Sequence, residues 1–266
     1  MTLAEKAERL RALHRGPPVL VLPNAWDVAS ARIFASIASC RALATTSAGI
    51  AAALGYPDGE RIPREEMIAV AGRIARAVEV PVSADLEAGY GDPGGTAEAA
   101  IEAGLAGMNL EDAAGDAGEH VERIREVRAT GERRGLPFVI NARIDLYIEA
   151  AGAPEERFPG TVERARRYVE AGADCIFVPA VEDAETIGRL AAAIDAPLNV
   201  LAGPSTPPVA QLERLGVARV TVGSGAMRAT LPLVRRIGEE LLEAGTFGFT
   251  GAGLPFGELM RLVERS

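Results

Sequence analysis

Short apolar runs recur along the chain, and stretches with helical periodicity separate them. Eight runs are apolar enough to predict buried strands, at residues 19–23, 42–46, 80–84, 107–110, 137–141, 175–179, 198–201 and 219–222. Between them, apolar positions repeat at helical spacing, as in the segment 63–78, where Pro63 suits the first position of a helix. Residues 3–13 show the same spacing and predict a helix ahead of the first strand. The pattern therefore predicts strictly alternating strands and helices.

Eight strand and helix units in 266 residues predict a (β/α)8 TIM barrel, an α/β fold, that forms a single domain over residues 1–266. An open doubly wound sheet is disfavoured because no glycine-rich phosphate turn follows the first strand. Beyond the eighth strand, a long helix at 231–244 and a short helix from residue 254 are expected. We expect the C-terminal helices, with the tail 245–266, to pack on or swap with a neighbouring subunit in a homo-oligomer, a dimer or a tetramer.

Charge and hydropathy exclude several partners. The chain has 28 basic and 37 acidic residues, a net charge of −9, which disfavours a nucleic acid partner. No apolar run approaches the roughly 18 residues of a membrane helix, so no membrane partner is expected. The N-terminal segment lacks the apolar stretch of a signal peptide, which favours a cytoplasmic protein.

The scarcity of lysine and histidine excludes whole classes of chemistry. Lys6 is the only lysine and lies before the first strand, so a Schiff-base aldolase, a pyridoxal enzyme and a P-loop enzyme are excluded. His14 and His120 are the only histidines, and neither His-x-x-x-His nor Cys-x-x-Cys occurs. A zinc site built from histidine or cysteine is therefore excluded, and any metal must be bound by oxygen.

Polar residues follow the predicted strands at the end of the barrel where active sites form. Asp85 and Glu87 follow the third strand, Glu111 the fourth and Arg143 the fifth. Carboxylates gathered there repel one another unless a divalent cation neutralises them, and oxygen donors suit Mg²⁺ or Mn²⁺. Arg143 offers a forked donor for a substrate carboxylate. After the second strand, the small residues Ser47-Ala48-Gly49 leave backbone N–H groups for an anion.

These strand ends resemble the isocitrate lyase/phosphoenolpyruvate mutase superfamily, and the resemblance covers nearly the whole chain. The motifs that carry it are Thr46-Ser47-Ala48-Gly49, Gly55-Tyr56-Pro57-Asp58, Asp85-Leu86-Glu87-Ala88-Gly89-Tyr90-Gly91, Leu110-Glu111-Asp112 and Asn141-Ala142-Arg143-Ile144-Asp145. The resemblance implies a Mg²⁺ ion held by Asp85, with Asp58, Glu87 and Glu111 acting mainly through metal-bound waters. Asp58, Glu111 and Arg143 are the residues that we expect to be catalytic.

The resemblance also implies a small α-keto or dicarboxylic acid as the substrate. Its carboxylate and keto oxygens would chelate the ion at Asp85, the backbone of Ser47, Ala48 and Gly49 would donate to it, and Arg143 would hold its carboxylate. Asn199, near the end of the seventh strand, is a further residue that we expect to contact the substrate.

Two segments depart from the pattern and leave the reaction open. Lyases of this superfamily resemble one another in a Lys-x-Cys-Gly motif after the fourth strand, whereas residues 113–119 contain neither lysine nor cysteine. They also resemble one another in a glutamate after the sixth strand, where this chain has Phe177-Val178-Pro179-Ala180. His120 could replace the missing acid–base group, although we favour a capping or surface role for it.

The expected function is that of a Mg²⁺-dependent enzyme of α-keto or 2-hydroxy carboxylic acids. It would act through an enolate, either as a C–C bond lyase or as an oxaloacetate-type decarboxylase. Two alternatives stay open: a phosphonopyruvate-type P–C mutase or hydrolase, and an α-keto acid binding protein with little activity.

Overall fold

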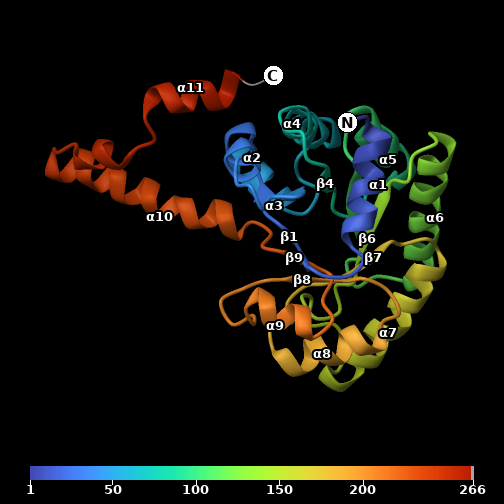
Figure 1. Cartoon of the computed structure of the whole chain (residues 1–266). Helices are drawn as coiled ribbons and strands as arrows, with labels where there is room; N and C mark the ends of the chain where they lie inside the picture. The colour runs from blue at the N-terminus through green and yellow to red at the C-terminus, as the bar shows by residue number, and fades with distance from the viewer. Residues whose placement is uncertain (265–266) are drawn as a thin grey trace.

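A computed structural model describes residues 1–264 and contains one parallel sheet that curls into a barrel (Figure 1). Neighbouring strands pair in the order β1-β9-β8-β7-β6-β5-β4-β3-β2. The strands are β1 (Leu20–Leu22), β2 (Asn24–Ala25), β3 (Leu43–Thr45), β4 (Val82–Asp85), β5 (Gly107–Glu111), β6 (Val139–Arg143), β7 (Cys175–Val178), β8 (Leu198–Leu201) and β9 (Arg219–Thr221).

The barrel closes through a change of pairing partner at Pro23. β1 pairs with β9, in the register Leu20 to Arg219, and β2 pairs with β3, in the register Asn24 to Ala44. Only Pro23, which has no N–H to donate, separates β1 from β2, so together they occupy one position of the barrel. The (β/α)8 barrel and its eight predicted strands are confirmed.

Most of the helices follow a strand and cover the outside of the barrel, whereas α1 precedes the first strand and α10 and α11 come after the last. They are α1 (Leu3–Leu13), α2 (Val28–Ala35), α3 (Ser47–Leu54), α4 (Arg64–Arg76), α5 (Pro93–Glu102), α6 (Ala117–Arg133), α7 (Pro154–Glu170), α8 (Ala184–Ala193), α9 (Val209–Arg214), α10 (Gly225–Glu239) and α11 (Phe256–Glu264). Two predicted starts are wrong. Pro63 is the N-cap of α4 rather than its first residue, and α10 begins at Gly225 rather than at residue 231.

Helix α1 covers the amino end of the barrel. The ammonium of Lys6 donates to the carbonyl of Val78, ahead of β4, and the guanidinium of Arg11 forms an ion pair of 2.8 Å with Asp174, ahead of β7. Leu10, a residue of α1, is fully buried. With the amino end covered, the carboxyl ends of the strands remain for a site.

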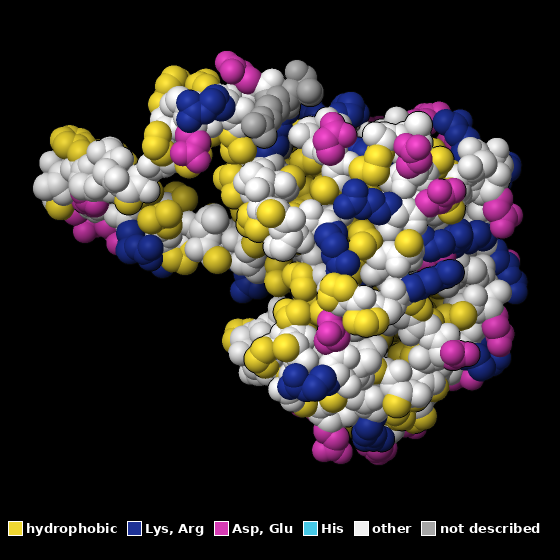
Figure 2. Space-filling view, viewed as in Figure 1, with side chains coloured by type: hydrophobic (Ala, Val, Ile, Leu, Met, Phe, Trp, Pro, Cys, Tyr) yellow, Lys and Arg dark blue, Asp and Glu magenta, His cyan; other side chains and the backbone are white. Residues whose placement is uncertain are grey.

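The last part of the chain, residues 225–264, forms a C-terminal arm that extends away from the barrel and then turns back (Figure 1). The arm consists of α10, a π-helical turn at Glu240–Ala244, a 3-10 helix at Gly248–Ala252 and α11. α11 lies on α2 of the same chain, where the Arg32 guanidinium donates to the carbonyl of Leu262 over 2.6 Å. Apolar side chains along the arm are exposed, Leu242 by 83% and Phe256 by 75% (Figure 2). Within residues 1–264, no helix is long and apolar enough to cross a membrane.

Candidate active site

Asp85 is the central carboxylate at the carboxyl end of the barrel. It is the last residue of β4, and one of its oxygens accepts from both the backbone N–H and the hydroxyl of Ser47, over 3.1 and 2.9 Å. The other oxygen accepts from the side-chain amide of Asn109, over 3.1 Å. These bonds hold a carboxylate from β4 between the start of α3 and the middle of β5.

The predicted anion-binding segment, residues 47–49, forms the first turn of α3. Its N-cap, Thr46, accepts from the N–H of Gly49 over 3.3 Å, and the Ser47 N–H bonds to Asp85. In the described chain, the N–H of Ala48 has no such partner and lies at the positive end of the helix dipole. Of the three predicted backbone donors, Ala48 is therefore the one still available to a ligand.

Glu87 lies beyond the end of β4, in a left-handed backbone conformation with φ of 52°. Only 3% of it is exposed, and its carboxylate accepts from the N–H of Glu60 and, over 3.2 Å, from the hydroxyl of Tyr90. Burial raises the pKa of Glu87 to about 7, and the neighbouring charges of Asp85 and Asp58 add to the increase. Asp58 itself is exposed and lies in a different loop, between α3 and α4.

Glu111, Arg143 and Asp145 form a chain of ion pairs beside Asp85. The Arg143 guanidinium lies 2.6 Å from a carboxylate oxygen of Glu111 and 2.6 Å from one of Asp145. It also lies 6.0 Å from the centre of the Phe177 ring. Burial raises the pKa of Glu111 to about 8, although the charge of Arg143 opposes the shift. Two nitrogens of the guanidinium that we expect to bind a substrate carboxylate, Nη1 and Nε, thus contact acids of the chain itself, and neither ion pair uses Nη2.

The donors present suit a hard divalent cation, but they do not form a ready-made protein cage. Within residues 1–264, no group of three or more histidine, cysteine, aspartate or glutamate side chains lies close enough to hold a metal. The donors at this end of the barrel are oxygens, and the pKa values of Glu87 and Glu111 are raised by burial and also by nearby carboxylates. Mg²⁺ commonly takes one or two carboxylates and keeps several waters. A Mg²⁺ ion bound directly by Asp85, with the other acids bound to its waters, would have this type of coordination.

The raised pKa values lead to a prediction for the metal-free protein. Between pH 6.5 and 8.5, folded Glu87 and Glu111 lose protons that the unfolded chain, with glutamate near 4.5, has already lost. The folded state therefore binds more protons, so stability falls as pH rises, by about 3 kcal/mol over this window. The buried histidines do not contribute there, because burial lowers the pKa of His14 and of His120 to about 4.

Urea unfolding in EDTA at the two pH values measures this loss. Glu111→Gln is expected to remove most of it, and saturating Mg²⁺ should reduce it. Equal stability at pH 6.5 and 8.5 without metal would contradict the assigned protonation.

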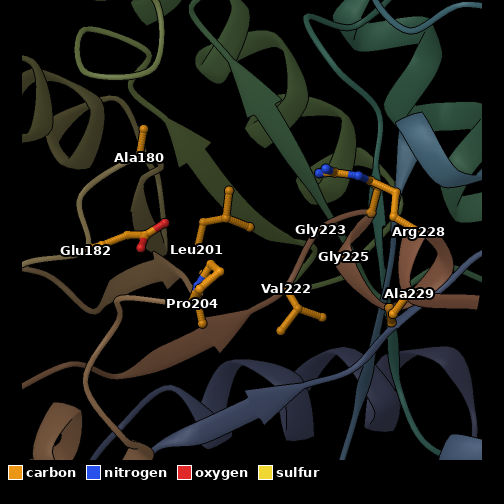
Figure 3. A pocket seen from close by; sticks show the side chains of 13 residues that line it. Ala180, Glu182, Leu201, Pro204, Val222, Gly223, Gly225, Arg228 and Ala229 are labelled. Carbon is orange, nitrogen blue, oxygen red and sulfur yellow. The ribbon is translucent and has the colours of Figure 1, made fainter. Parts of the chain in front are cut away.

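A cavity of about 790 Å³ opens at the same end of the barrel, over the ends of β7, β8 and β9. Leu201, Pro204 and Val222 form the apolar wall of the cavity. The side chains of Glu182 and Arg228 line it on opposite sides (Figure 3). The Glu182 carboxylate accepts from the N–H of Ser205 over 2.9 Å. Neither Glu182 nor Arg228 lies at the end of a predicted strand, so the strand pattern of the sequence does not point to them.

Two other sequence predictions have different outcomes. Asn199 is fully buried in the barrel interior, with its Nδ2 unpartnered, and its contact with a substrate stays a prediction. The expected capping or surface role of His120 is wrong. His120 is buried on α6, and its ring packs edge-on against Tyr168 with the ring centres 4.6 Å apart. Its spacing from Ile124 and Val127 places it on the buried face of the helix.

Comparison with known proteins identifies the family. The model of the phosphoenolpyruvate phosphomutase family matches residues 10–242. An uncharacterised protein of Mycobacterium tuberculosis is 37% identical over 79% of this chain and 80% of its own length. A Corynebacterium glutamicum protein named "Probable 2-methylisocitrate lyase 2" is 32% identical over 73% of this chain and 66% of its own. A Rhodopseudomonas palustris oxaloacetate decarboxylase is 28% identical over 100% of this chain and 95% of its own.

A solved structure agrees with the barrel. A chain from Burkholderia cenocepacia J2315 superposes with a TM-score of 0.87 at 37% identity, over 97% of this chain and 96% of that chain. The matched segment 10–242 contains every strand of the barrel and the strand ends that carry Asp85, Glu87, Glu111 and Arg143. The chain therefore belongs to the isocitrate lyase/phosphoenolpyruvate mutase superfamily.

Proposed function

We propose that this chain is a Mg²⁺-dependent enzyme that makes or breaks a C–C bond in small α-keto or 2-hydroxy carboxylic acids, as a lyase or an oxaloacetate-type decarboxylase. The observation that carries the proposal is the placement of Asp85, Glu87, Glu111 and Arg143 together at the carboxyl end of the barrel. The names of the relatives, lyase and decarboxylase, support the same class of reaction. When bound, the cation would neutralise charge that develops on the keto oxygen of the substrate.

The residues of the chain would divide the remaining work. Arg143 can donate to a substrate carboxylate from Nη2, which neither of its ion pairs uses, and the Ala48 N–H can donate a further hydrogen bond. Glu87 and Glu111, with pKa values of about 7 and 8, can each hold or release a proton near neutral pH, which is what a general acid or base requires. Glu182 and Arg228 would contact the part of the substrate that extends into the adjoining cavity.

Phosphonate chemistry is the second candidate, because the family model that matches is that of a phosphomutase. Products from a panel of keto acids and phosphonopyruvate would decide between the two reactions.

The test of the proposed site joins metal and ligand in one measurement. An α-keto acid that binds only the folded protein, together with Mg²⁺, should raise the melting temperature by about 5–10 °C at about 100 times its dissociation constant. Pyruvate, oxaloacetate and 2-oxoglutarate are the ligands to use. Propionate and glutarate lack the keto oxygen and should give a much smaller shift. Equal shifts for keto and deoxo acids, or a shift that survives EDTA, would count against the chelate.

We also propose that the C-terminal arm packs on a second copy of the chain, in a dimer or tetramer. Val234 and Leu242 are exposed on the part of the arm that extends away from the barrel (Figure 1), and Phe256 is exposed at the start of α11. Large exposed apolar surfaces are typical of interfaces. Light scattering should therefore give at least twice the chain mass of 27.8 kDa. The double substitution Leu242→Glu and Phe256→Glu should yield monomers, whereas a monomeric parent protein would refute the proposal.

A further inference from the structure

Arg219 is a buried cation that the proposed chemistry does not use. It is the first residue of β9, its exposed fraction is 0%, and it is one of the largest fully buried side chains in residues 1–264. In that part of the chain no carboxylate forms an ion pair with it, and its Nε has no hydrogen-bond partner. Burying an unpaired guanidinium costs free energy, so an apolar residue would serve the core better.

The hydrogen bonds of Arg219 connect the covered end of the barrel to the site. On one side, a terminal nitrogen lies 3.5 Å from Nε2 of His14. Nδ1 of His14 must carry a proton, because it lies 2.8 Å from the carbonyl of Leu10, which can only accept. Burial lowers the pKa of His14 to about 4, so the ring is neutral and Nε2 is an acceptor that faces Arg219.

On the other side, Arg219 helps to determine how the amide of Asn109 is oriented. The Oδ1 of Asn109 accepts from the Arg219 guanidinium over 3.4 Å and from Nδ2 of Asn141 over 2.7 Å. With two donors at Oδ1, the amide nitrogen is left to face Asp85, to which it donates over 3.1 Å. A flipped amide would turn its NH₂ toward both donors and its oxygen toward the carboxylate.

The bonding pattern also places a positive charge below the acids of the site. Asp85 is among the charges that act on Arg219, although the two side chains do not touch. Residues that hydrogen-bond to a metal ligand orient it and so influence metal binding. Loss of one of these hydrogen-bond partners typically weakens metal binding by about 10- to 100-fold.

We propose that Arg219 is a positioning residue: it fixes the amide of Asn109, and Asn109 in turn fixes the carboxylate of Asp85 for the cation. This inference rests on the proposed function, because it assigns Asp85 to the metal. It predicts that the effect of Arg219 on metal affinity passes through Asn109.

The test measures Mn²⁺ affinity by titration calorimetry on the full chain without substrate. Arg219→Met, which keeps the length of the side chain and removes its donors, is expected to weaken Mn²⁺ binding by about tenfold or more. In an Asn109→Leu background the same substitution should weaken Mn²⁺ binding little further, because Asn109, through which the effect of Arg219 passes, is already absent. Cys175→Ala is the matched control, since Cys175 is also fully buried inside the barrel but has no bond to Asn109, and its Mn²⁺ affinity should equal that of the parent.

The outcomes separate the inference from the proposed function. A parent chain that binds no Mn²⁺ overturns the proposed metal site. If the parent binds Mn²⁺ and Arg219→Met binds it equally well, or if the loss persists in the Asn109→Leu background, Arg219 is only a core residue. Arg219→Lys covers the case in which Arg219→Met does not fold. It retains a positive charge but not the guanidinium, so its Mn²⁺ affinity should still be below that of the parent, and parent-like affinity would overturn the inference.

Discussion

Replacing Asp85 with asparagine is expected to lower kcat/KM for α-keto acids by about 100- to 1,000-fold, the loss typical of removing a group that stabilises charge in the transition state. Asparagine has nearly the shape of aspartate but lacks the charge that would hold Mg²⁺. The variant would also place an amide against Ser47 and Asn109, which now donate to the carboxylate. Steady-state turnover at saturating Mg²⁺ measures the loss.

Asp195→Asn is the control for this substitution. Asp195 is exposed in the loop ahead of β8, at the opposite end of the barrel, and its neutralisation should change kcat/KM by no more than about twofold. Parent-like turnover by Asp85→Asn, or full turnover of the parent in excess EDTA, would refute the assignment of the cation to Asp85.

The barrel could be predicted from the sequence because its strands are covered on both faces and are therefore short apolar runs. The details that were not predicted depend on contacts between distant segments. Nothing in the run around Pro23 indicates that β1 pairs with β9 while β2 pairs with β3. The start of α10 was placed too late because Pro232 lies inside the helix, where proline is normally disfavoured.

The acids and Arg143 could be predicted because parallel strands bring their carboxyl ends to one side of the barrel. Glu182 and Arg228 could not, since they lie in a loop and in the first turns of a helix, where position depends on the path of the chain. The role of Arg219 is harder still to predict from the sequence. An arginine that opens an apolar run suggests an exposed strand end, and only the closed barrel brings it to Asn109.

Arg143→Lys is expected to weaken α-keto acid binding by about 1.5–3 kcal/mol, which corresponds to roughly 10- to 150-fold in Kd. The guanidinium of Arg143 spans Glu111 and Asp145, each at 2.6 Å, so it is held in place by two acids before any substrate arrives. Lysine keeps the charge, but a single ammonium cannot span both acids and also donate to a substrate carboxylate from a separate nitrogen, as the guanidinium can. Calorimetric titration with Mg²⁺ and an unreactive keto acid analogue gives the affinity.

Arg166→Lys tests whether the loss belongs to the site or to any arginine between two acids. Arg166 also bridges two carboxylates, lying 2.8 Å from Glu163 and 2.6 Å from Glu170, but on the exposed face of α7. Arg166 and its two partners lie on an exposed helix face and contact none of the site residues, so this variant should bind the keto acid as the parent does. If Arg143→Lys also binds like the parent, Arg143 serves only to neutralise Glu111 and Asp145, and the substrate carboxylate must be held elsewhere, with Arg228 in the adjoining cavity as the next residue to replace.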